Sequence, residues 1–416
     1  MTTKALKKIL KDQLKLRQTQ GILKGKETVI CGIKAAQNNR GPRLYLEGQG
    51  EKQFLQMNSN SYLGLSRNPQ VIGAEEAAVA KFGTGPGAVR FISGTYEPHI
   101  QLEKRLAAFH YRQSAMLFSA AYSTVMAVLP ALITPETIVI SDALNHNCII
   151  NGIKLSRPAA KHIYGHLDME ELEIKLQQAV GSGKRVIVIS DGIFSMRGDY
   201  APLDKLVAIC QDYEQNFAEG IITIIDDSHG VGAFGQTGRG TEEYTNTRID
   251  LLIGTLGKAM GINGGYITGS STIINYLRET APFYIYSNPI TPAEAAAACK
   301  SLDILDSPEG YALLERVRTL SKRLQAGLID LGLEVISGEH PIVPLLIGDT
   351  EKTALLVEYL FQNNILATGL KYPVVPRGDE EIRFQISADH TPKDIDFVLT
   401  VLQQLKIHQV KTVQTS

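Results

Sequence analysis

The chain has 416 residues, of which 44% are hydrophobic and 20% are charged, and its net charge is −1. This balance offers no bulk attraction to nucleic acid, so no nucleic-acid partner is expected. No apolar stretch is long enough for a membrane span, and the length favours two domains that share a site. The four cysteines are scattered without a CxxC pair, which is typical of reduced thiols in a cytoplasmic protein.

The first segment, residues 4–16, is a basic amphipathic stretch. Its apolar side chains fall on one side of a helix: Leu6, Ile9, Leu10 and Leu14. The pattern suits a helix on a membrane surface or an arm that packs on the body or on a partner subunit, and we expect the packed arm. A short β pair is predicted next, at 43–46 and 54–57.

Four short apolar runs in the middle of the chain each end in polar side chains. Continuous runs of this kind are typical of strands buried on both faces of a parallel sheet. Helices are predicted around them, at 71–82 and starting at Pro98, Asp168 and Pro202. The run 138–140 precedes Asp142 and His146, and the run 186–189 precedes Asp191 and Ser195. The run 221–225 precedes Asp226 and His229, and the run 251–253 precedes Thr255 and Lys258. Because ligands of open α/β sheets bind beyond the carboxyl ends of the strands, these side chains predict one site.

The pattern changes after Pro289. An alanine-rich helix at 292–304 and an amphipathic helix at 313–328 precede strands near 341–347 and 382–386, with helices starting at Thr353 and Thr391. This predicts a smaller α+β domain. We therefore expect an arm with a short β segment over 1–57, a large domain over 58–295 and a small domain over 296–416.

Lys258 lies between glycines, in Gly254-Thr-Leu-Gly-Lys258-Ala-Met-Gly261, directly after an apolar run. Asp226 ends another such run. Pyridoxal phosphate (PLP) requires a lysine that forms a Schiff base and an acid that keeps a proton on the pyridine nitrogen. The two residues therefore predict a PLP site.

Three other motifs are weaker. The stretch 230–235 matches G-x-G-x-x-G, but the glycine-rich residues after it cannot open the helix that a dinucleotide site requires. Ala259 stands where a P-loop needs Ser or Thr to bind magnesium. His162 and His166 have an i,i+4 spacing but enclose a glycine and no glutamate. They are interpreted as surface histidines, and no metal site is expected.

Taken together, these motifs make the chain resemble the α-oxoamine synthases, a family of fold-type I PLP enzymes. Within the family it is most similar to the glycine C-acetyltransferase (2-amino-3-ketobutyrate CoA ligase) branch, although 121–125, 147–148 and 288–292 depart from the pattern of that branch. The stretches that carry the resemblance are 60–65, 89–95, 141–146, 191–196, 226–229, 254–261, 372–376 and 382–388. The resemblance implies a fold-type I transferase fold, with a mostly parallel sheet in the large domain, a smaller α+β domain and a homodimeric assembly.

The resemblance also implies a role for each site residue. Lys258 would hold PLP and later take the α-proton of the substrate. Asp226 would face the ring nitrogen, and His146 would stack on the ring. Ser195 and His229 would donate hydrogen bonds near the phenolic oxygen.

The remaining site residues would bind the two anionic groups. The PLP phosphate would be held by the backbone at Ala121 and Tyr122, as an anion at a helix N-terminus, and by the hydroxyl of Thr255. Ser287 and Asn288 would reach it from the neighbouring subunit. The amino-acid carboxylate would pair with Arg383, with Asn60 nearby.

The implied activity is the condensation of an amino acid with an acyl thioester, with release of the thiol and with or without decarboxylation. Glycine and a short acyl-CoA are the first expectation, and another amino acid or an acyl-carrier-protein (acyl-ACP) thioester is the alternative. An aminotransferase needs only Lys258, Asp226 and Arg383, and it stays open as a different class of enzyme. A non-catalytic subunit would be expected to lose the lysine, which this chain retains.

Overall fold

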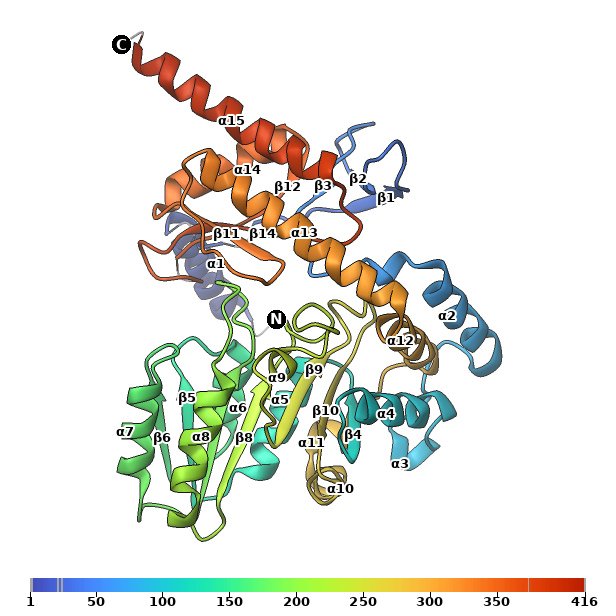
Figure 1. The fold of residues 1–416 in the computed structure, drawn as a ribbon, viewed down its shortest axis with the longest axis vertical. Coiled ribbons are helices and arrows are strands. Elements are labelled where there is room, and N and C mark those ends of the chain that lie inside the picture. The colour runs from blue at the N-terminus through green and yellow to red at the C-terminus, as the bar shows by residue number, and fades with distance from the viewer. Residues whose placement is uncertain (1–2, 21, 24, 373, 415–416) are drawn as a thin grey trace.

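The computed structural model describes residues 3–20, 22–23, 25–372 and 374–414, with side chains up to residue 405. Figure 1 shows a large sheet with its helices in the lower half of the molecule and a smaller sheet with its helices above it. No helix among the described residues is both long and apolar enough to cross a membrane.

Within the described residues, the large sheet has seven strands in the order β4-β10-β9-β8-β7-β5-β6. The pairs from β9 to β6 are parallel, and β10 is antiparallel to both of its neighbours. The strands are β4 (Ser114–Phe118), β5 (Thr137–Asp142), β6 (Ala160–Tyr164), β7 (Arg185–Asp191), β8 (Ile221–Asp226), β9 (Leu251–Thr255) and β10 (Gly265–Gly269). All four predicted runs are strands of this sheet, so the mostly parallel fold is confirmed.

Helices cover both faces of the sheet, because successive side chains of a strand point to opposite sides. In β7, Ile187 and Ile189 belong to one core cluster, and Val186 and Val188 belong to the other. The first face is covered by α5 (Ala121–Leu132), α6 (Asn147–Leu155) and α10 (Ser271–Thr280). The second is covered by α2 (Pro69–Phe82), α4 (Glu97–Phe109), α7 (Met169–Ala179), α8 (Leu203–Tyr213) and α12 (Pro292–Leu305). Short helical turns complete this part: η1 (Leu65–Arg67), α3 (Arg90–Ser93), η2 (Glu214–Asn216), α9 (Thr241–Tyr244) and α11 (Pro282–Ile285).

The smaller part is built on an antiparallel sheet of order β11-β14-β13. Its strands and helices are β11 (Ile342–Leu346), β13 (Thr368–Leu370), β14 (Glu381–Gln385), α13 (Pro308–Asp330), α14 (Thr350–Gln362) and α15 (Pro392–Gln414). They enclose a separate core that includes Leu324, Leu360 and Phe384. The predicted domain limits, 57/58 and 295/296, stay predictions.

The predicted β pair near the N-terminus, 43–46 with 54–57, is found only as one antiparallel bridge. β2 (Arg43–Leu46) pairs with β1 (Ile30–Lys34), and only one bridge, between Leu44 and Phe54, joins it to the next segment. β3 (Leu55–Gln56) instead runs parallel to β12 (Ile365–Leu366) of the smaller part. The N-terminal β segment is therefore fixed to the C-terminal half of the chain.

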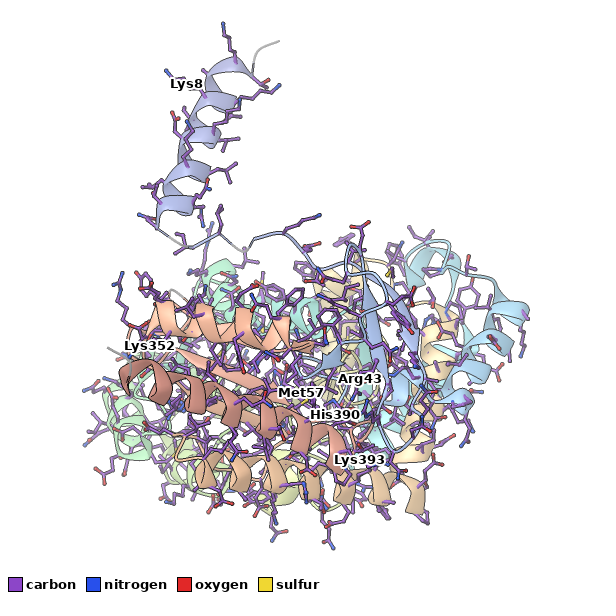
Figure 2. All side chains as sticks on the ribbon, turned by 90° about the horizontal axis from the view of Figure 1, so that it is seen from above. Lys8, Arg43, Met57, Lys352, His390 and Lys393 are labelled. Carbon is purple, nitrogen blue, oxygen red and sulfur yellow. The ribbon has the colours of Figure 1, made fainter. Side chains whose placement is uncertain are left out.

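The predicted amphipathic helix is present as α1 (Lys4–Thr19), but it stands away from the body, as Figure 2 shows. None of its residues is buried, and Leu6, Ile9, Leu10 and Leu14 are all exposed. The expected packing on the body of the same chain is therefore not found. Packing on a partner subunit stays a prediction.

Candidate active site

The carboxyl ends of β5, β7, β8 and β9 surround one cavity of about 260 Å³. This convergence follows from the parallel arrangement, in which the loops after each strand emerge on the same edge of the sheet. The predicted site residues that line the cavity are Ala121, Tyr122, His146, Ser195, Asp226, His229, Thr255 and Lys258. Asn60, Ser287, Asn288 and Arg383 are not among its lining residues in the described chain.

Lys258 enters the cavity from the turn after β9. The backbone N–H of Gly257 donates to the hydroxyl of Thr255 at 3.1 Å, and the N–H of Gly261 donates to the carbonyl of Lys258 at 3.0 Å. The turn is therefore held by hydrogen bonds both before and after Lys258. Burial lowers the pKa of Lys258 to about 8, although the charges of Asp226 and Asp191 oppose this effect. A substantial share of the amine is therefore neutral, and hence nucleophilic, near pH 8.

Asp226 ends β8 with a fixed carboxylate. The N–H of Ser228 donates to Oδ1 at 3.2 Å, and the Ser228 hydroxyl donates to the same oxygen. The thiol of Cys148 lies 3.6 Å from Oδ2. The next acid, Asp227, is used differently, because its carboxylate accepts hydrogen bonds from the N–H and hydroxyl of Thr241, at 2.6 and 2.7 Å, and does not line the cavity.

His146 is the first residue after the β5 loop and caps α6. Its backbone N–H donates to Oδ2 of Asp191 at 3.1 Å, and its Nδ1 lies 2.9 Å from the sulfur of Cys148. Burial lowers the pKa of His146, so the ring is neutral and is available to cover a flat ligand. Burial, followed by the charge of Asp226, raises the pKa of Asp191, and Oδ1 of this acid is buried with no hydrogen-bond partner among the described residues.

The start of α5 lines the cavity with backbone N–H groups. The backbone N–H groups of Ala121 and Tyr122 belong to the first turn of the helix, where no intrahelical acceptor exists. Gly265 of β10 permits this wall to lie close, since a Cβ there would fall 2.3 Å from the backbone nitrogen of Ala121. Open N–H groups at a helix N-terminus suit a phosphate.

His229 is connected to Asn60 through Tyr62. The Tyr62 hydroxyl lies 2.8 Å from Nδ1 of His229 and 3.3 Å from Oδ1 of Asn60, and that amide oxygen also accepts a hydrogen bond from Gln385. Burial lowers the pKa of His229 well below its usual value. Asn60 therefore lies behind the cavity wall, one side chain away from His229.

Arg383 reaches the cavity edge from β14 of the smaller part. Its Nη1 donates to the carbonyl of Ser195 at 2.6 Å, while its Nε is buried without a partner among the described residues. Burial lowers the pKa of Arg383. Ser287 and Asn288 follow α11, outside the cavity of their own chain, and Asn288 is exposed.

The residues present fit PLP. A buried amine at Lys258, a fixed carboxylate at Asp226 and open backbone donors at Ala121 lie around one cavity, and these are the groups that its carbonyl, ring nitrogen and phosphate require. Two buried atoms without a partner among the described residues could form further hydrogen bonds with a ligand: Oδ1 of Asp191 and, at the cavity edge, Nε of Arg383.

Three other residues are close to the chemistry but were absent from the predicted set: Tyr62, Cys148 and Ser228. Asp191 was predicted at the site as a strand-end residue, but no role was assigned to it. Asp191 gave a usable signal, since it ends β7 as Asp226 ends β8, and the two stand opposite each other in the sheet register. The contact of Tyr62 with His229 joins segments far apart in the sequence, so no local pattern could predict it.

The interpretation of His166 as a surface histidine is wrong. Its two ring nitrogens lie 3.1 Å from carboxylate oxygens of Asp142 and Asp199. Burial alone would lower the pKa of His166, but these hydrogen bonds outweigh it and raise the pKa to about 9. The ring is therefore a charged link between two loops of the large part.

A polar cluster stands at the rim of the cavity. The hydroxyl of Tyr122 donates to Oδ1 of Asn147 at 2.9 Å and accepts from Nδ2 of Asn151 at 2.7 Å. These side chains belong to α5 and α6, and all are hydrogen-bonded to one another. The rim next to the predicted phosphate site is therefore polar rather than apolar.

Several known proteins are similar to this chain. The profile of the family described as aminotransferase class I and II matches residues 52–402. The chain is 38% identical to 8-amino-7-oxononanoate synthase of Bacillus pumilus (strain SAFR-032), over 85% of this chain and 88% of that protein. It is 37% identical to the mitochondrial 2-amino-3-ketobutyrate coenzyme A ligase of Homo sapiens, over 92% of this chain and 91% of that protein. A structure of serine palmitoyltransferase (SPT) with PLP matches at a TM-score of 0.85 and 25% identity, with 97% of each chain covered.

Proposed function

Because the chain belongs to the α-oxoamine synthases of the class I and II aminotransferase family, we propose that the cavity around Lys258 condenses glycine with a short acyl-CoA. The chain is a PLP-dependent acyltransferase that joins an amino acid to an acyl thioester. The proposal concerns the two substrates and the residues that act on them. The observation that carries it is the shared cavity of Lys258, Asp226 and the open start of α5.

When bound, PLP supplies an electron-withdrawing ring that stabilises negative charge at the α-carbon of the amino acid. Lys258 would hold the cofactor and then take the α-proton of the amino acid on Nζ, a role supported by the lowered pKa of its amine. Asp226 would keep a proton on the ring nitrogen, with its carboxylate held by Ser228. His146, whose backbone N–H is bound to Asp191, would pack against the ring in its neutral form.

Arg383 binds the carboxylate of the amino acid. A guanidinium offers two parallel N–H donors to a carboxylate, and the Nε of Arg383 is still without a partner. The hydrogen bond from its Nη1 to the carbonyl of Ser195 fixes the orientation of the guanidinium. Asn60 contributes indirectly, since it orients Tyr62 against His229.

The polar rim at Tyr122 supports a short acyl group. The hydrogen-bonded polar groups of Tyr122, Asn147 and Asn151 would give a long acyl chain little apolar surface to pack against at this rim. An acetyl or slightly longer group needs little such surface. The alternative, another amino acid or an acyl-ACP thioester, is kept because 8-amino-7-oxononanoate synthase is among the similar proteins.

The working unit is a homodimer in this proposal. Ser287 and Asn288 lie outside the cavity of their own chain, on a segment that follows α11, which leaves them free to reach the phosphate of a neighbouring copy. Mixing Lys258→Ala chains with chains changed at both Ser287 and Asn288 to Ala should restore part of the activity in heterodimers. Full activity of a monomer would contradict this arrangement.

A matrix of substrates tests the proposal. Purified protein with PLP is given each of several amino acids together with acyl-CoAs of two to sixteen carbons or an acyl-ACP, and free thiol release is measured. The proposal predicts the highest kcat/KM for glycine with the shortest acyl-CoAs and no release by Lys258→Ala. A higher kcat/KM with a long acyl chain, with acyl-ACP or with another amino acid would contradict the proposed pair of glycine and a short acyl-CoA. The proposed roles of the residues would be unaffected by that result.

A further inference from the structure

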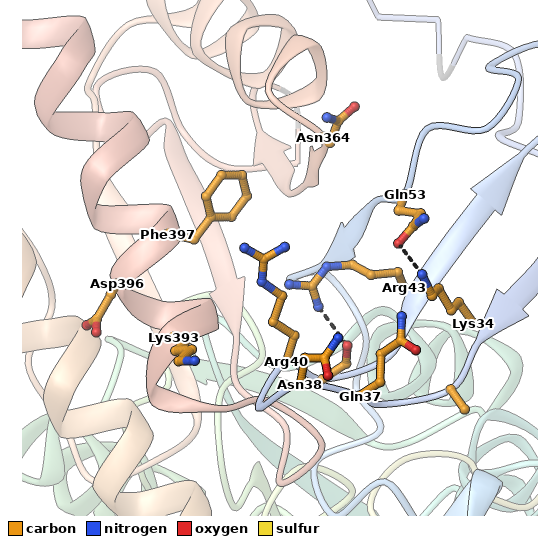
Figure 3. A pocket seen from close by; sticks show the side chains of 12 residues that line it. Lys34, Gln37, Asn38, Arg40, Arg43, Gln53, Asn364, Lys393, Asp396 and Phe397 are labelled. Atoms are coloured by element: carbon orange, nitrogen blue, oxygen red, sulfur yellow. Dashed lines mark hydrogen bonds between the residues drawn. The ribbon is translucent and has the colours of Figure 1, made fainter.

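A second and larger cavity lies on the smaller part, between the β1–β2 hairpin and the first turns of α15 (Figure 3). Its volume is about 800 Å³, compared with about 260 Å³ for the cavity around Lys258. Among the described residues, the two cavities have no lining residue in common. A cavity of this volume is large enough for a small organic ligand.

The lining carries uncompensated positive charge. The cations that line it are Lys34, Arg40, Arg43 and Lys393, and Asp396 is its acid. Asp396 is neutralised from outside, because Arg323 of α13 donates to both of its carboxylate oxygens, at 2.7 and 2.9 Å. Arg43 is likewise paired, with the buried carboxylate of Asp394.

Three cations remain after these pairs are removed. Within the described part of the chain, Arg40 and Lys393 have no ion pair and no side-chain hydrogen bond. Lys34 donates only to the neutral amide of Gln53, at 3.2 Å. An anionic ligand therefore meets three positive charges that no carboxylate of the chain has neutralised.

Arg40 is held in place by its backbone. Gln37 and Arg40 exchange backbone hydrogen bonds of 3.1 and 2.9 Å around Asn38 and Asn39, whose φ angles are 53° and 58°. Positive φ at both central positions is the hairpin turn that Asn favours. The Thr391 hydroxyl at the start of α15 donates to the carbonyl of Asn39 at 2.9 Å, so the turn is tied to the helix.

The next residue, Gly41, fixes the other side of this turn. Its N–H donates to Oδ2 of Asp394 at 2.8 Å, and a Cβ at this position would lie 2.4 Å from the carbonyl oxygen of Asp389. Only glycine permits this approach without a shift of backbone. The hairpin therefore presents the Arg40 guanidinium toward the side of the cavity that carries Phe397, as Figure 3 shows.

The rest of the lining suits a planar polar group. Phe397 of α15 keeps 38% of its surface exposed, although large aromatic side chains are usually buried. The amides of Gln37, Asn38 and Gln53 stand on the hairpin side of the same cavity. An aromatic face with nearby amides can stack a heterocyclic base and hydrogen-bond its edge.

We propose that this cavity binds a nucleotide, with its phosphates on Arg40, Lys393 and Lys34 and its base against Phe397. Two sources share this chemistry: the nucleotide end of a CoA thioester, and a free nucleotide that acts as an effector. Binding of the nucleotide end of a CoA thioester rests on the proposed function, whereas binding of a nucleotide in this cavity does not. Binding is measured without amino acid or turnover, so failure of the site and failure of the proposed reaction can be told apart.

Calorimetric titration of the PLP-loaded full-length protein with adenosine 3′,5′-bisphosphate tests the site. We expect binding that weakens about tenfold in Arg40→Gln and about a hundredfold in the Arg40→Gln/Lys393→Gln double variant. Phe397→Leu should weaken the bisphosphate but leave the weak binding of inorganic phosphate unchanged. Lys205→Gln, at an exposed lysine of α8, removes one charge elsewhere and should bind as wild type does.

Steady-state kinetics distinguish the two sources. If the cavity holds the nucleotide end of the thioester, Arg40→Gln raises KM for acyl-CoA and leaves KM for the corresponding acyl-N-acetylcysteamine, which has no nucleotide, unchanged. If the ligand is a free nucleotide, both KM values of Arg40→Gln match those of Lys205→Gln, while its bisphosphate binding is still weakened about tenfold. The proposal is overturned if wild-type protein does not bind the bisphosphate, or if the double variant binds it as tightly as Lys205→Gln.

Discussion

The thiol of Cys148 lies 3.6 Å from Oδ2 of Asp226, on the side of the carboxylate that Ser228 does not contact. The same sulfur lies 2.9 Å from Nδ1 of His146. Burial, followed by the charge of Asp226, raises the pKa of Cys148 far above its usual value, so the thiol keeps its proton and can donate. Cys148 therefore positions two residues proposed to contact the cofactor.

Cys148→Ala should lower kcat by about tenfold, because Asp226 loses a hydrogen-bond donor at a charged group. Cys148→Ser keeps a donor and should recover most of this loss. KM for the amino acid should change little in both variants, since Arg383 is untouched. Steady-state kinetics of the two variants check this expectation, and an alanine variant as active as wild type would show that the thiol only fills space.

Asp226→Asn should lower kcat on the order of a hundredfold or more while PLP remains bound, because an amide cannot stabilise a proton on the ring nitrogen. The matched control is Asp227→Asn. Burial raises the pKa of Asp227 to about 7, and its carboxylate faces Thr241 rather than the cavity. This control should keep activity within a few-fold of wild type. An equal loss of kcat in Asp226→Asn and Asp227→Asn would contradict the assignment of the cofactor contact to Asp226 alone.

Lys258 should be the residue to which borohydride reduction fixes PLP, and peptide mapping would locate the label. Since the pKa of Lys258 is lowered by burial to about 8, the rate at which the apoprotein captures PLP should rise as the pH passes through 8. Lys258→Ala should bind PLP without a covalent bond. A label on another lysine would contradict the assignment.

His166 should make stability depend on pH in a defined window. Its pKa is raised in the folded state to about 9, so its contribution is fully present below the unfolded value of about 6.5 and is lost as the pH rises through 9. The difference in unfolding free energy between wild type and His166→Gln should therefore be largest at pH 6 and smallest near pH 10. Urea unfolding across this range measures it, and a constant difference would mean that the ring is uncharged.

The sequence predicted the catalytic edge of the sheet because strands buried on both faces leave continuous apolar runs. In β7 and β8 these runs are bounded by Asp191 and Asp226, and the parallel register brings the two acids together. Lys258 was found by the glycines around it, which a tight turn after a strand requires.

Contacts between distant segments could not be predicted in the same way. β1 contains a glycine and is largely exposed, so it lacked the alternation that marks a half-buried strand and its pairing with β2 was missed. Tyr62 reaches His229 across the chain, and Arg40 meets the first turn of α15 only in the folded molecule. These relationships join segments far apart in the sequence, and such contacts leave no periodic signal in it.

The most direct test of the central claim measures free thiol release from an acyl thioester with and without an amino acid. The account predicts that release requires both substrates together, and that it is lost in Lys258→Ala and reduced at low amino-acid concentration in Arg383→Lys, because a point charge cannot reproduce the two-pronged contact with a carboxylate. Transfer of amino groups to keto acids in the absence of any thioester, with no thiol released when one is added, would contradict it.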